Sequence, residues 1–242
     1  MAASETTTTL GLDERERLLR GSYIFRNLAP ELAHRLAQLC HIRTLPEGAI
    51  LFQQGDEGDA LYAVVSGLIR IAIAGEGGKE LTLGLMEPGD VFGEIALLDG
   101  LTRTAGAQAA ENSVLLVVQR AHFLQMLEAE SGFARHIIEL LCERLRINTD
   151  RITEYAFLNL HARLARKIES LAIAHGQHGD DGVRIALQLS QSELAQMLGV
   201  TREAVNKQLK SWSQAGVLRV ERGAITVCDM RALAAAGRGE TI

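Results

Sequence analysis

Cysteine is scarce in this chain, and its few residues have no regular spacing. The 242-residue sequence contains only Cys40, Cys142 and Cys228. Cysteines at such wide intervals form neither a metal-binding motif nor a disulfide framework, which fits a reducing cytoplasm. We therefore expect each thiol to be a buried apolar group, and we expect neither a metal site nor a covalent cofactor.

Long apolar runs and a secretory leader are also missing. No apolar stretch reaches the ~18 residues that suggest a membrane span. The first residues lead into four threonines, without the basic and then apolar pattern of a signal peptide. The sequence therefore predicts a cytoplasmic protein without a membrane partner, and it predicts a flexible arm over residues 1–20.

Positive charge is in short supply overall, although not in the C-terminal part. The net charge is −5. Residues 1–150 contain 13 basic and 21 acidic side chains (net −8), and residues 151–242 contain 12 and 9 (net +3). A mildly basic C-terminal part permits nucleic-acid binding without proving it. The length suits two compact domains better than one.

Short strands separated by turns are predicted between residues 42 and 120. Glycine, proline and aspartate mark the turns. The apolar or alternating runs lie at residues 60–65, 68–74, 80–86 and 114–118. Many short strands at this spacing indicate an antiparallel sandwich or barrel. A short helix over residues 30–39 precedes it.

A long helix is predicted over residues 132–158, with an apolar seam. The seam contains two series at seven-residue spacing: Ile138, Leu145 and Ile152, and Leu141, Asn148 and Tyr155. Such a seam pairs with another helix, and the expected partner is a second copy of the chain. Polar Asn148 interrupts the seam, and Thr149 follows it. Either an Asn–Asn pair fixes the register of a dimer, or the two side chains contact a ligand at the interface.

Two short segments contain groups suited to a ligand with a phosphate and a sugar hydroxyl. The candidate residues are Gly93, Glu94, Ile95, Ala96, Arg103 and Thr104. Arg103 offers a planar fork of donors for phosphate oxygens, and Thr104 adds a hydroxyl. Gly93 lets backbone N–H groups come close, and Glu94 accepts from a sugar hydroxyl. The alternative is a tight loop with a structural Glu–Arg ion pair, because short phosphate motifs are weak signals.

Residues 190–215 predict a helix-turn-helix. Ser190 and Glu193 form a capping-box pattern, Gly199 ends the first helix, and Thr201 caps the second. The exposed positions of the second helix are Arg202, Glu203, Asn206, Lys207 and Lys210, and the inward ones are Val205, Leu209 and Trp212. The exposed residue types read base edges in a major groove. The alternative is a structural helical unit with a solvated charged face.

Shorter signals surround this motif. Asn159 is a good N-cap for a helix that continues to about residue 174, after a hinge at residues 157–159. A loop is predicted at residues 175–182. Two strands at residues 217–220 and 224–227 form a wing.

Together these motifs closely resemble the CRP/FNR family of bacterial transcription regulators, over about residues 22–230. The resemblance implies an α+β protein with an N-terminal antiparallel β-roll (jelly-roll-like) domain, a long dimerisation helix and a C-terminal winged helix-turn-helix domain. The expected boundaries are 1–20 for the arm, 21–131 for the cyclic-nucleotide-binding domain, 132–158 for the dimerisation helix and 159–242 for the DNA-binding domain.

The resemblance also implies roles in the cyclic-nucleotide branch of that family. Glu94 would bind the ribose 2′-hydroxyl, Arg103 and Thr104 the cyclic phosphate, and Gly93 would contribute its backbone. Ile95 and Ala96 complete this part of the site. The cAMP-binding members have Thr-Ser where this chain has Asn148-Thr149, so the effector is either cAMP or cGMP.

On the DNA side, the resemblance implies a homodimer that binds a palindromic duplex and contacts RNA polymerase. The implied DNA-binding residues are Ser190, Gln191, Thr201, Arg202, Glu203, Asn206, Lys207 and Lys210. Arg202 and Glu203 match the family's base-reading pair. The third reader is usually Arg, and Lys207 stands there without a bidentate fork.

Other branches and classes fit less well. The iron–sulfur branch needs an N-terminal cysteine cluster, and the haem branch an axial ligand in the β-roll, where no histidine lies between His41 and His122. A constitutive regulator, or one with another effector, remains an alternative. A nucleotide-binding regulatory subunit acting on a protein partner is the alternative from another class. An enzyme is not expected, since no nucleophile–base pairing or metal cluster appears.

Overall fold

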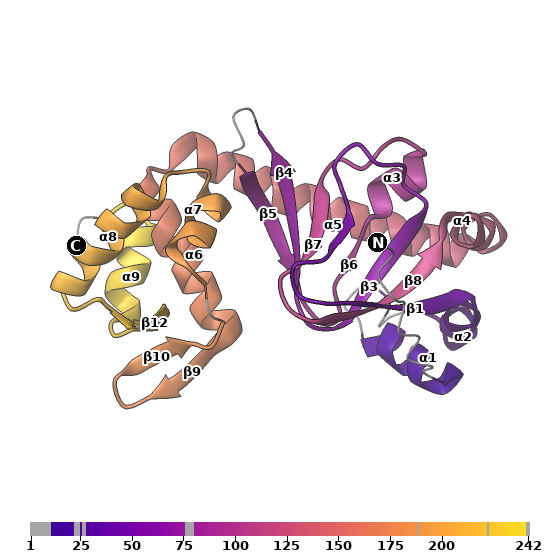
Figure 1. Cartoon of the computed structure of the whole chain (residues 1–242), viewed down its shortest axis with the longest axis horizontal. Helices are drawn as coiled ribbons and strands as arrows, with labels where there is room; N and C mark the ends of the chain where they lie inside the picture. The colour runs from indigo at the N-terminus through magenta and orange to yellow at the C-terminus, as the bar shows by residue number, and fades with distance from the viewer. Residues whose placement is uncertain are drawn as a thin grey trace. The chain divides into compact units, whose positions relative to one another are not determined.

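The chain divides into two compact units, Met1–Arg144 and Leu145–Ile242, which are described separately. The computed structural model describes residues 11–21, 25, 28–75, 80–187, 189–221 and 223–240. Helix α5 (Ser131–Phe157) contributes to both units, one residue earlier at each end than the sequence predicts. Figure 1 shows the path of the chain from the N-terminus to the C-terminus.

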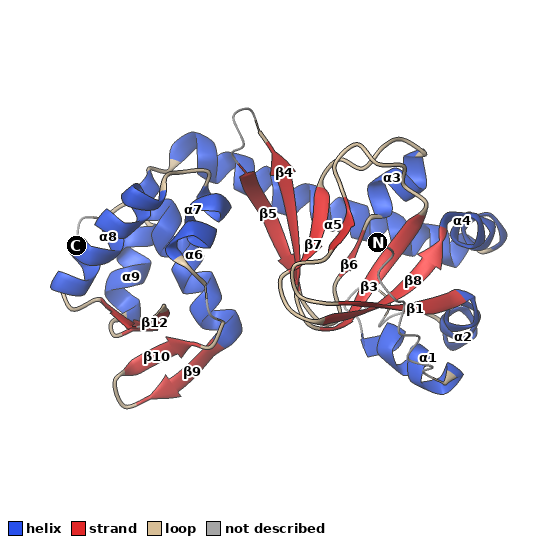
Figure 2. Ribbon diagram, in the orientation of Figure 1, coloured by secondary structure: helices blue, strands red, loops and turns tan. Residues whose placement is uncertain are grey.

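The first unit is a roll of two four-stranded antiparallel sheets, as predicted (Figure 2). One sheet has the order β1-β8-β3-β6 and the other the order β2-β7-β4-β5. The strands are β1 (Cys40–Leu45), β2 (Ile50–Phe52), β3 (Ala60–Ser66), β4 (Ile69–Ala74), β5 (Glu80–Met86), β6 (Val91–Phe92), β7 (Gly106–Ala109) and β8 (Ser113–Gln119).

Strands β3 and β8 separate two hydrophobic cores. Side chains alternate between the faces of a strand. In β8, Leu115 and Val117 pack in the core that also contains residues of the second sheet, whereas Leu116 and Val118 face the core formed with the helices. Both faces are thus buried, which explains why β8 is a continuous apolar run rather than an alternating one.

Among the described residues of this unit, four helices shorter than α5 accompany the roll. They are α1 (Leu12–Gly21), α2 (Pro30–Leu39), α3 (Glu94–Asp99) and α4 (Arg120–Ala129). The prediction of a flexible arm is wrong for α1; residues 1–10 lie outside the described residues. Helix α1 forms because Leu19 is fully buried, Arg15 donates to the Cys40 carbonyl (2.7 Å), and Glu16 lies 2.9 Å from His34. These long-range contacts outweigh its polar composition.

The second unit combines helices with one small sheet. The helices are α6 (Leu160–His175), α7 (Gln191–Leu198), α8 (Arg202–Gln214) and α9 (Met230–Gly237). Three predicted caps are confirmed. The Asn159 side chain accepts from the Ala162 amide, Ser190 and Glu193 form the complete capping box, and Thr201 accepts from the Ala204 amide. Local rules therefore place these helix starts correctly.

The sheet of this unit is larger than the predicted two-strand wing. Its order is β11-β12-β10-β9, with β9 (Gly176–Gly179), β10 (Gly182–Ile185), β11 (Leu218–Glu221) and β12 (Ala224–Val227). The predicted loop at residues 175–182 is wrong. Strand β10 pairs with β12 as well as with β9, and this non-local pairing makes a hairpin of a sequence rich in turn residues.

Two of the three cysteines correct the prediction of buried thiols. Cys40 is buried, and burial raises its pKa to about 12. Cys142, on α5, and Cys228, just after β12, are exposed. The apolar character of a cysteine side chain is therefore not enough to predict its burial, because the position's orientation in the fold decides it. None of the described helices is long and apolar enough to cross a membrane.

Candidate functional site

The two predicted phosphate and sugar segments lie next to each other in the first unit. Gly93 follows β6 and is the N-cap of α3, with a left-handed φ of 85°. A non-glycine residue is strained there. The N–H groups of a helix's first residues have no partner in a preceding turn. In α3 these belong to Glu94, Ile95 and Ala96, the residues that the sequence analysis assigns to the ligand.

Arg103 connects the two segments through its guanidinium. Its Nη1 donates to the Gly93 carbonyl and its Nη2 to the Ala60 carbonyl, each at 2.8 Å. The backbone is held as well, since the Arg103 amide donates to the Asp56 carbonyl at 2.8 Å. Arg103 is only 3% exposed, and its Nε has no hydrogen-bond partner among the described residues. A buried guanidinium with an unused N–H is suited to an additional acceptor such as a phosphate oxygen.

Aromatic rings hold the same guanidinium in place. Its central carbon lies 4.3 Å from the Phe52 ring centroid and 5.6 Å from that of Tyr62. Both rings also belong to an aromatic cluster with Phe92. Burial raises the pKa of Tyr62, and the positive charge of Arg103 opposes that rise. The Arg103 cation is therefore preorganised by cation–π contacts as well as by hydrogen bonds.

Glu94 has a partner that the sequence reasoning missed. It is 5% exposed, and its Oε1 lies 3.0 Å from Nη1 of Arg144 on α5. Arg144 also donates to the Val91 carbonyl. The predicted alternative of a Glu94–Arg103 ion pair is not what the structure contains, since the two residues have different partners. No local signal marks Arg144, because it is one arginine among several on a charged helix.

The remaining predicted ligand residues have different surroundings. Thr104 and Ile95 are exposed beside the buried Arg103 and Glu94, and Ala96 is buried. Asn148 and Thr149 belong to the second unit and are exposed on α5. The Thr149 hydroxyl donates to the Leu145 carbonyl at 2.9 Å. The contribution of Asn148 and Thr149 to a ligand site stays a prediction.

The predicted base-reading face lies on α8. Arg202, Glu203, Asn206, Lys207 and Lys210 are all exposed, and within the described ranges none of their side chains has a hydrogen-bond or ion-pair partner. On the opposite face, Val205, Leu209 and Trp212 are buried. The Trp212 ring meets His161 of α6 edge to face, with centroids 5.0 Å apart. Helix α8 is thus anchored on one side and free to contact a ligand on the other.

The other three predicted DNA contacts, Ser190, Gln191 and Thr201, lie at the starts of α7 and α8. Ser190 is exposed, but its hydroxyl oxygen accepts from the Glu193 amide at 3.2 Å. Gln191 is half-buried at the first position of α7. Thr201 likewise uses its hydroxyl oxygen for the cap of α8. These polar groups orient the two helices, and their contact with DNA stays a prediction.

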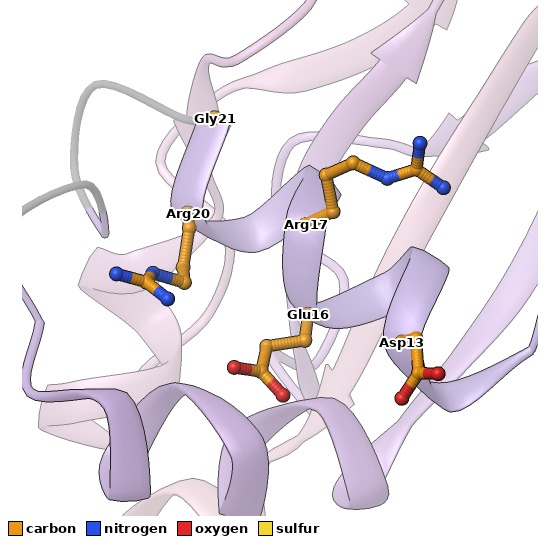
Figure 3. A pocket seen from close by; sticks show the side chains of 5 residues that line it. All are labelled: Asp13, Glu16, Arg17, Arg20 and Gly21. Carbon is orange, nitrogen blue, oxygen red and sulfur yellow. The ribbon is translucent and has the colours of Figure 1, made fainter.

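A surface pocket lies elsewhere, along α1. Its volume is about 560 Å³, and its lining residues are Asp13, Glu16, Arg17, Arg20 and Gly21. Figure 3 shows that Arg17 and Arg20 extend in different directions from the helix, so they do not converge on one ligand. None of the predicted site residues lines this pocket. Within the described ranges, no group of three His, Cys, Asp or Glu side chains could hold a metal ion.

Two protein-family profiles match the chain. The cyclic nucleotide-binding domain profile matches residues 42–130, and the Crp-like helix-turn-helix domain profile matches residues 162–236. Together with the roll and the winged helix, they define a DNA-binding transcription regulator with a cyclic nucleotide-binding domain.

Similar proteins of full length identify the family. The cyclic AMP receptor protein of Thermus thermophilus is 34% identical, over 86% of this chain and 94% of its own. The CRP-like cAMP-activated global transcriptional regulator of Mycobacterium tuberculosis is 27% identical over 92% and 100%. The solved structure of the c-di-GMP responsive regulator CLP of Xanthomonas campestris has a TM-score of 0.73 at 25% identity, over 83% and 100%. The chain belongs to the CRP/FNR family, whose members are transcription regulators and not enzymes.

Proposed function

We propose that this chain is a homodimeric regulator whose affinity for a palindromic DNA site is controlled by cAMP. The observation that carries the ligand part is the buried Arg103 guanidinium with its unpartnered Nε, next to the buried carboxylate of Glu94. The cyclic phosphate would bind Arg103 and Thr104. The ribose 2′-hydroxyl would bind Glu94, where the hydroxyl joins or replaces Arg144.

The hydroxyl of Thr149 supports cAMP over cGMP. Because this hydroxyl donates its proton to the Leu145 carbonyl, its oxygen is available as an acceptor. The exocyclic amino group of adenine is a donor and matches it, whereas guanine has a carbonyl oxygen in that position. Turning the hydroxyl toward guanine would break a hydrogen bond worth about 0.5–1.5 kcal/mol. Asn148 offers both a donor and an acceptor and does not discriminate.

The exposed seam of α5 supports the dimer. Ile138, Leu145, Ile152 and Tyr155 are all large apolar or aromatic residues that are exposed on the single chain. Pairing with a second copy would bury them. The dimer would present two copies of α8 about one DNA turn apart, ~34 Å. A promoter-bound dimer acts where the bacterial chromosome lies, in the cytoplasm, and RNA polymerase is its expected partner.

Calorimetric titration tests the ligand assignment. We expect cAMP to bind more tightly than cGMP by about fivefold to tenfold, the difference in affinity that the loss of one hydrogen bond would cause. Thr149→Val should reduce cAMP affinity severalfold and leave cGMP affinity unchanged. Tighter binding of cGMP would refute the choice of nucleotide, and binding of c-di-GMP alone would refute the cyclic-mononucleotide site.

Selection from random duplexes tests the DNA part. We expect recovery of a two-fold symmetric site whose affinity rises when cAMP is added. Equal affinity with and without any nucleotide would indicate the constitutive alternative. The absence of any selected duplex would favour a regulatory subunit that acts on a protein.

A further inference from the structure

The C-terminal end of α7 is held by side chains from two other helices. Met197 and Leu198 are its last residues, and the last carbonyls of a helix have no partner within it. The hydroxyl of Tyr155, on α5, donates to the Met197 carbonyl at 3.3 Å. Nη1 of Arg163, on α6, donates to the Leu198 carbonyl at 3.2 Å. Both carbonyls are thereby satisfied from outside the helix-turn-helix.

The two donating side chains also contact each other. The guanidinium carbon of Arg163 lies 4.6 Å from the centroid of the Tyr155 ring, a cation–π distance. Nε of Arg163 is buried, with no hydrogen-bond partner among the described residues. We call Tyr155, Arg163 and the two α7 carbonyls the α7 clamp. Its parts are mutually dependent, because moving Tyr155 removes both a hydrogen bond and the ring that covers Arg163.

The clamp spans the short connection between α5 and α6. Helix α5 ends at Phe157 and α6 begins at Leu160, so Tyr155 lies before the connection and Arg163 after it. Such a short connection does not by itself fix the direction of the helix that follows. An ion pair between Glu154 and Arg166, at 3.1 Å, also links the two sides of the connection. Its side chains are both partly exposed, and the pair does not include α7. Exposed ion pairs of this kind contribute little to stability.

We propose that Tyr155 and Arg163 are positioning residues that couple the end of α5 to the helix-turn-helix. The inference rests on the proposed function, because it concerns how nucleotide binding changes DNA affinity. A change of packing along α5 would move Tyr155, and the clamp would pass that movement to α7 and so to α8. Without the clamp, the two sites would bind their ligands more independently.

The measure of this role is the coupling ratio, the DNA Kd without cAMP divided by that with saturating cAMP. It is obtained from fluorescence anisotropy of a labelled operator with the full-length protein. Tyr155→Phe keeps the ring and loses the hydroxyl, and Arg163→Gln loses the cation. We expect Tyr155→Phe to reduce the ratio at least threefold and Arg163→Gln about tenfold, with cAMP affinity without DNA changed less than threefold.

Two further variants keep the test decisive. Glu154→Gln removes the negative charge from the Glu154–Arg166 pair across the connection without changing any group of the α7 clamp, so it should keep the wild-type ratio within twofold. Arg163→Lys retains the charge and the packing of the stem and should fall between wild type and Arg163→Gln. If Arg163→Gln does not unfold cooperatively, Arg163→Lys replaces it as the test of the Arg163 side chain.

The outcomes separate the clamp from the proposed function. A wild-type ratio near one would refute the cAMP response itself, and the role of the clamp with it. A large wild-type ratio that Tyr155→Phe and the Arg163 variants all keep would overturn the clamp alone. An equal loss in Glu154→Gln would also overturn it, because any loosening of the connection would then suffice.

Discussion

The phosphate and sugar segments of the first unit and the predicted base-reading face of α8 in the second unit use arginine in opposite ways. Arg103 is buried, bonded to two backbone carbonyls and covered by Phe52. Arg202 is exposed on α8, without a hydrogen-bond or ion-pair partner in the described part of the chain. The first arginine therefore belongs to the fold as much as to the ligand site, whereas the second is available only for a partner. Stability and binding should be linked at Arg103 and separate at Arg202.

The largest expected effect is that of Arg103→Ala. It leaves the Ala60 and Gly93 carbonyls without these donors, at roughly 1–3 kcal/mol for the buried Ala60 carbonyl and less for the partly buried Gly93 carbonyl. It also removes the phosphate ligand, so cAMP binding should be lost. Denaturant unfolding and calorimetry measure the two effects.

Arg103→Lys sharpens that result. Lysine keeps the charge but lacks the planar fork, so it cannot reach both carbonyls and a phosphate in the same way. We expect intermediate stability and weak cAMP binding. If Arg103→Ala unfolds at the wild-type denaturant concentration, the structural part of this account is wrong.

Gly93→Ala should have the next largest effect, and it tests how closely the backbone and Arg103 are packed. A Cβ at this position would lie 2.9 Å from Nη1 of Arg103 and 3.2 Å from the Ala60 carbonyl oxygen. The positive φ adds strain of about 1–3 kcal/mol. The guanidinium must also shift, so we expect cAMP affinity to fall about tenfold or more, or 1.4 kcal/mol.

Gly48→Ala is the matched control for that substitution. Gly48 has a similar φ of 80°, and a Cβ there would meet nothing within 4 Å. It should lose similar stability and keep wild-type cAMP affinity. Equal losses of affinity in both variants would show that strain alone, and not the displacement of Arg103, weakens the site.

Arg202→Ala should weaken DNA binding without weakening the fold. A lost base contact costs about 1–3 kcal/mol of binding free energy. The free energy of unfolding should change by less than about 0.5 kcal/mol, as is usual at exposed positions. Anisotropy with a selected operator measures the first, and Gln214→Ala, at the exposed end of α8, is the control. A large loss of stability would break the contrast with Arg103.

Lys207→Arg should produce the smallest effect, an increase in the sequence selectivity of the base-reading face of α8. An arginine fork can bind the O6 and N7 atoms of guanine together, which a lysine ammonium does less selectively. We expect a stronger preference for guanine at one position of each half-site, by roughly 1 kcal/mol. Selection and sequencing of bound duplexes would show this change. An unchanged preference at every position would show that Lys207 does not contact a base.

Features set by neighbouring residues could be predicted from the sequence. The caps at Asn159, Ser190 and Thr201 follow from a side chain and an amide a few residues away. Four strands of the roll follow from apolar or alternating runs at residues 60–65, 68–74, 80–86 and 114–118. The two motifs, with the resemblance they support, lead to the correct family. In each case the decisive interactions lie close together along the chain.

The missed features depend on distant residues. Helix α1 is stabilised by Cys40 and His34, and β10 by its pairing with β12. Helix α9 was not predicted, and it packs through the bond from Arg166 to the Gly237 carbonyl (2.8 Å). At the site, the partnership of Glu94 with Arg144 and the packing of Phe52 on Arg103 each join residues that are about 50 positions apart. No local pattern encodes such pairs.

The contrast among the three cysteines makes the protein suitable for labelling without engineering. The thiol of Cys40 is buried, and its pKa of about 12 keeps it protonated and unreactive at neutral pH. Cys142 and Cys228 are exposed, one on α5 and the other beside the wing. A thiol-reactive dye or spin label would therefore attach at these two positions of the natural chain. The distance between the labels, followed during a cAMP titration, would test whether the nucleotide changes the separation of these two positions.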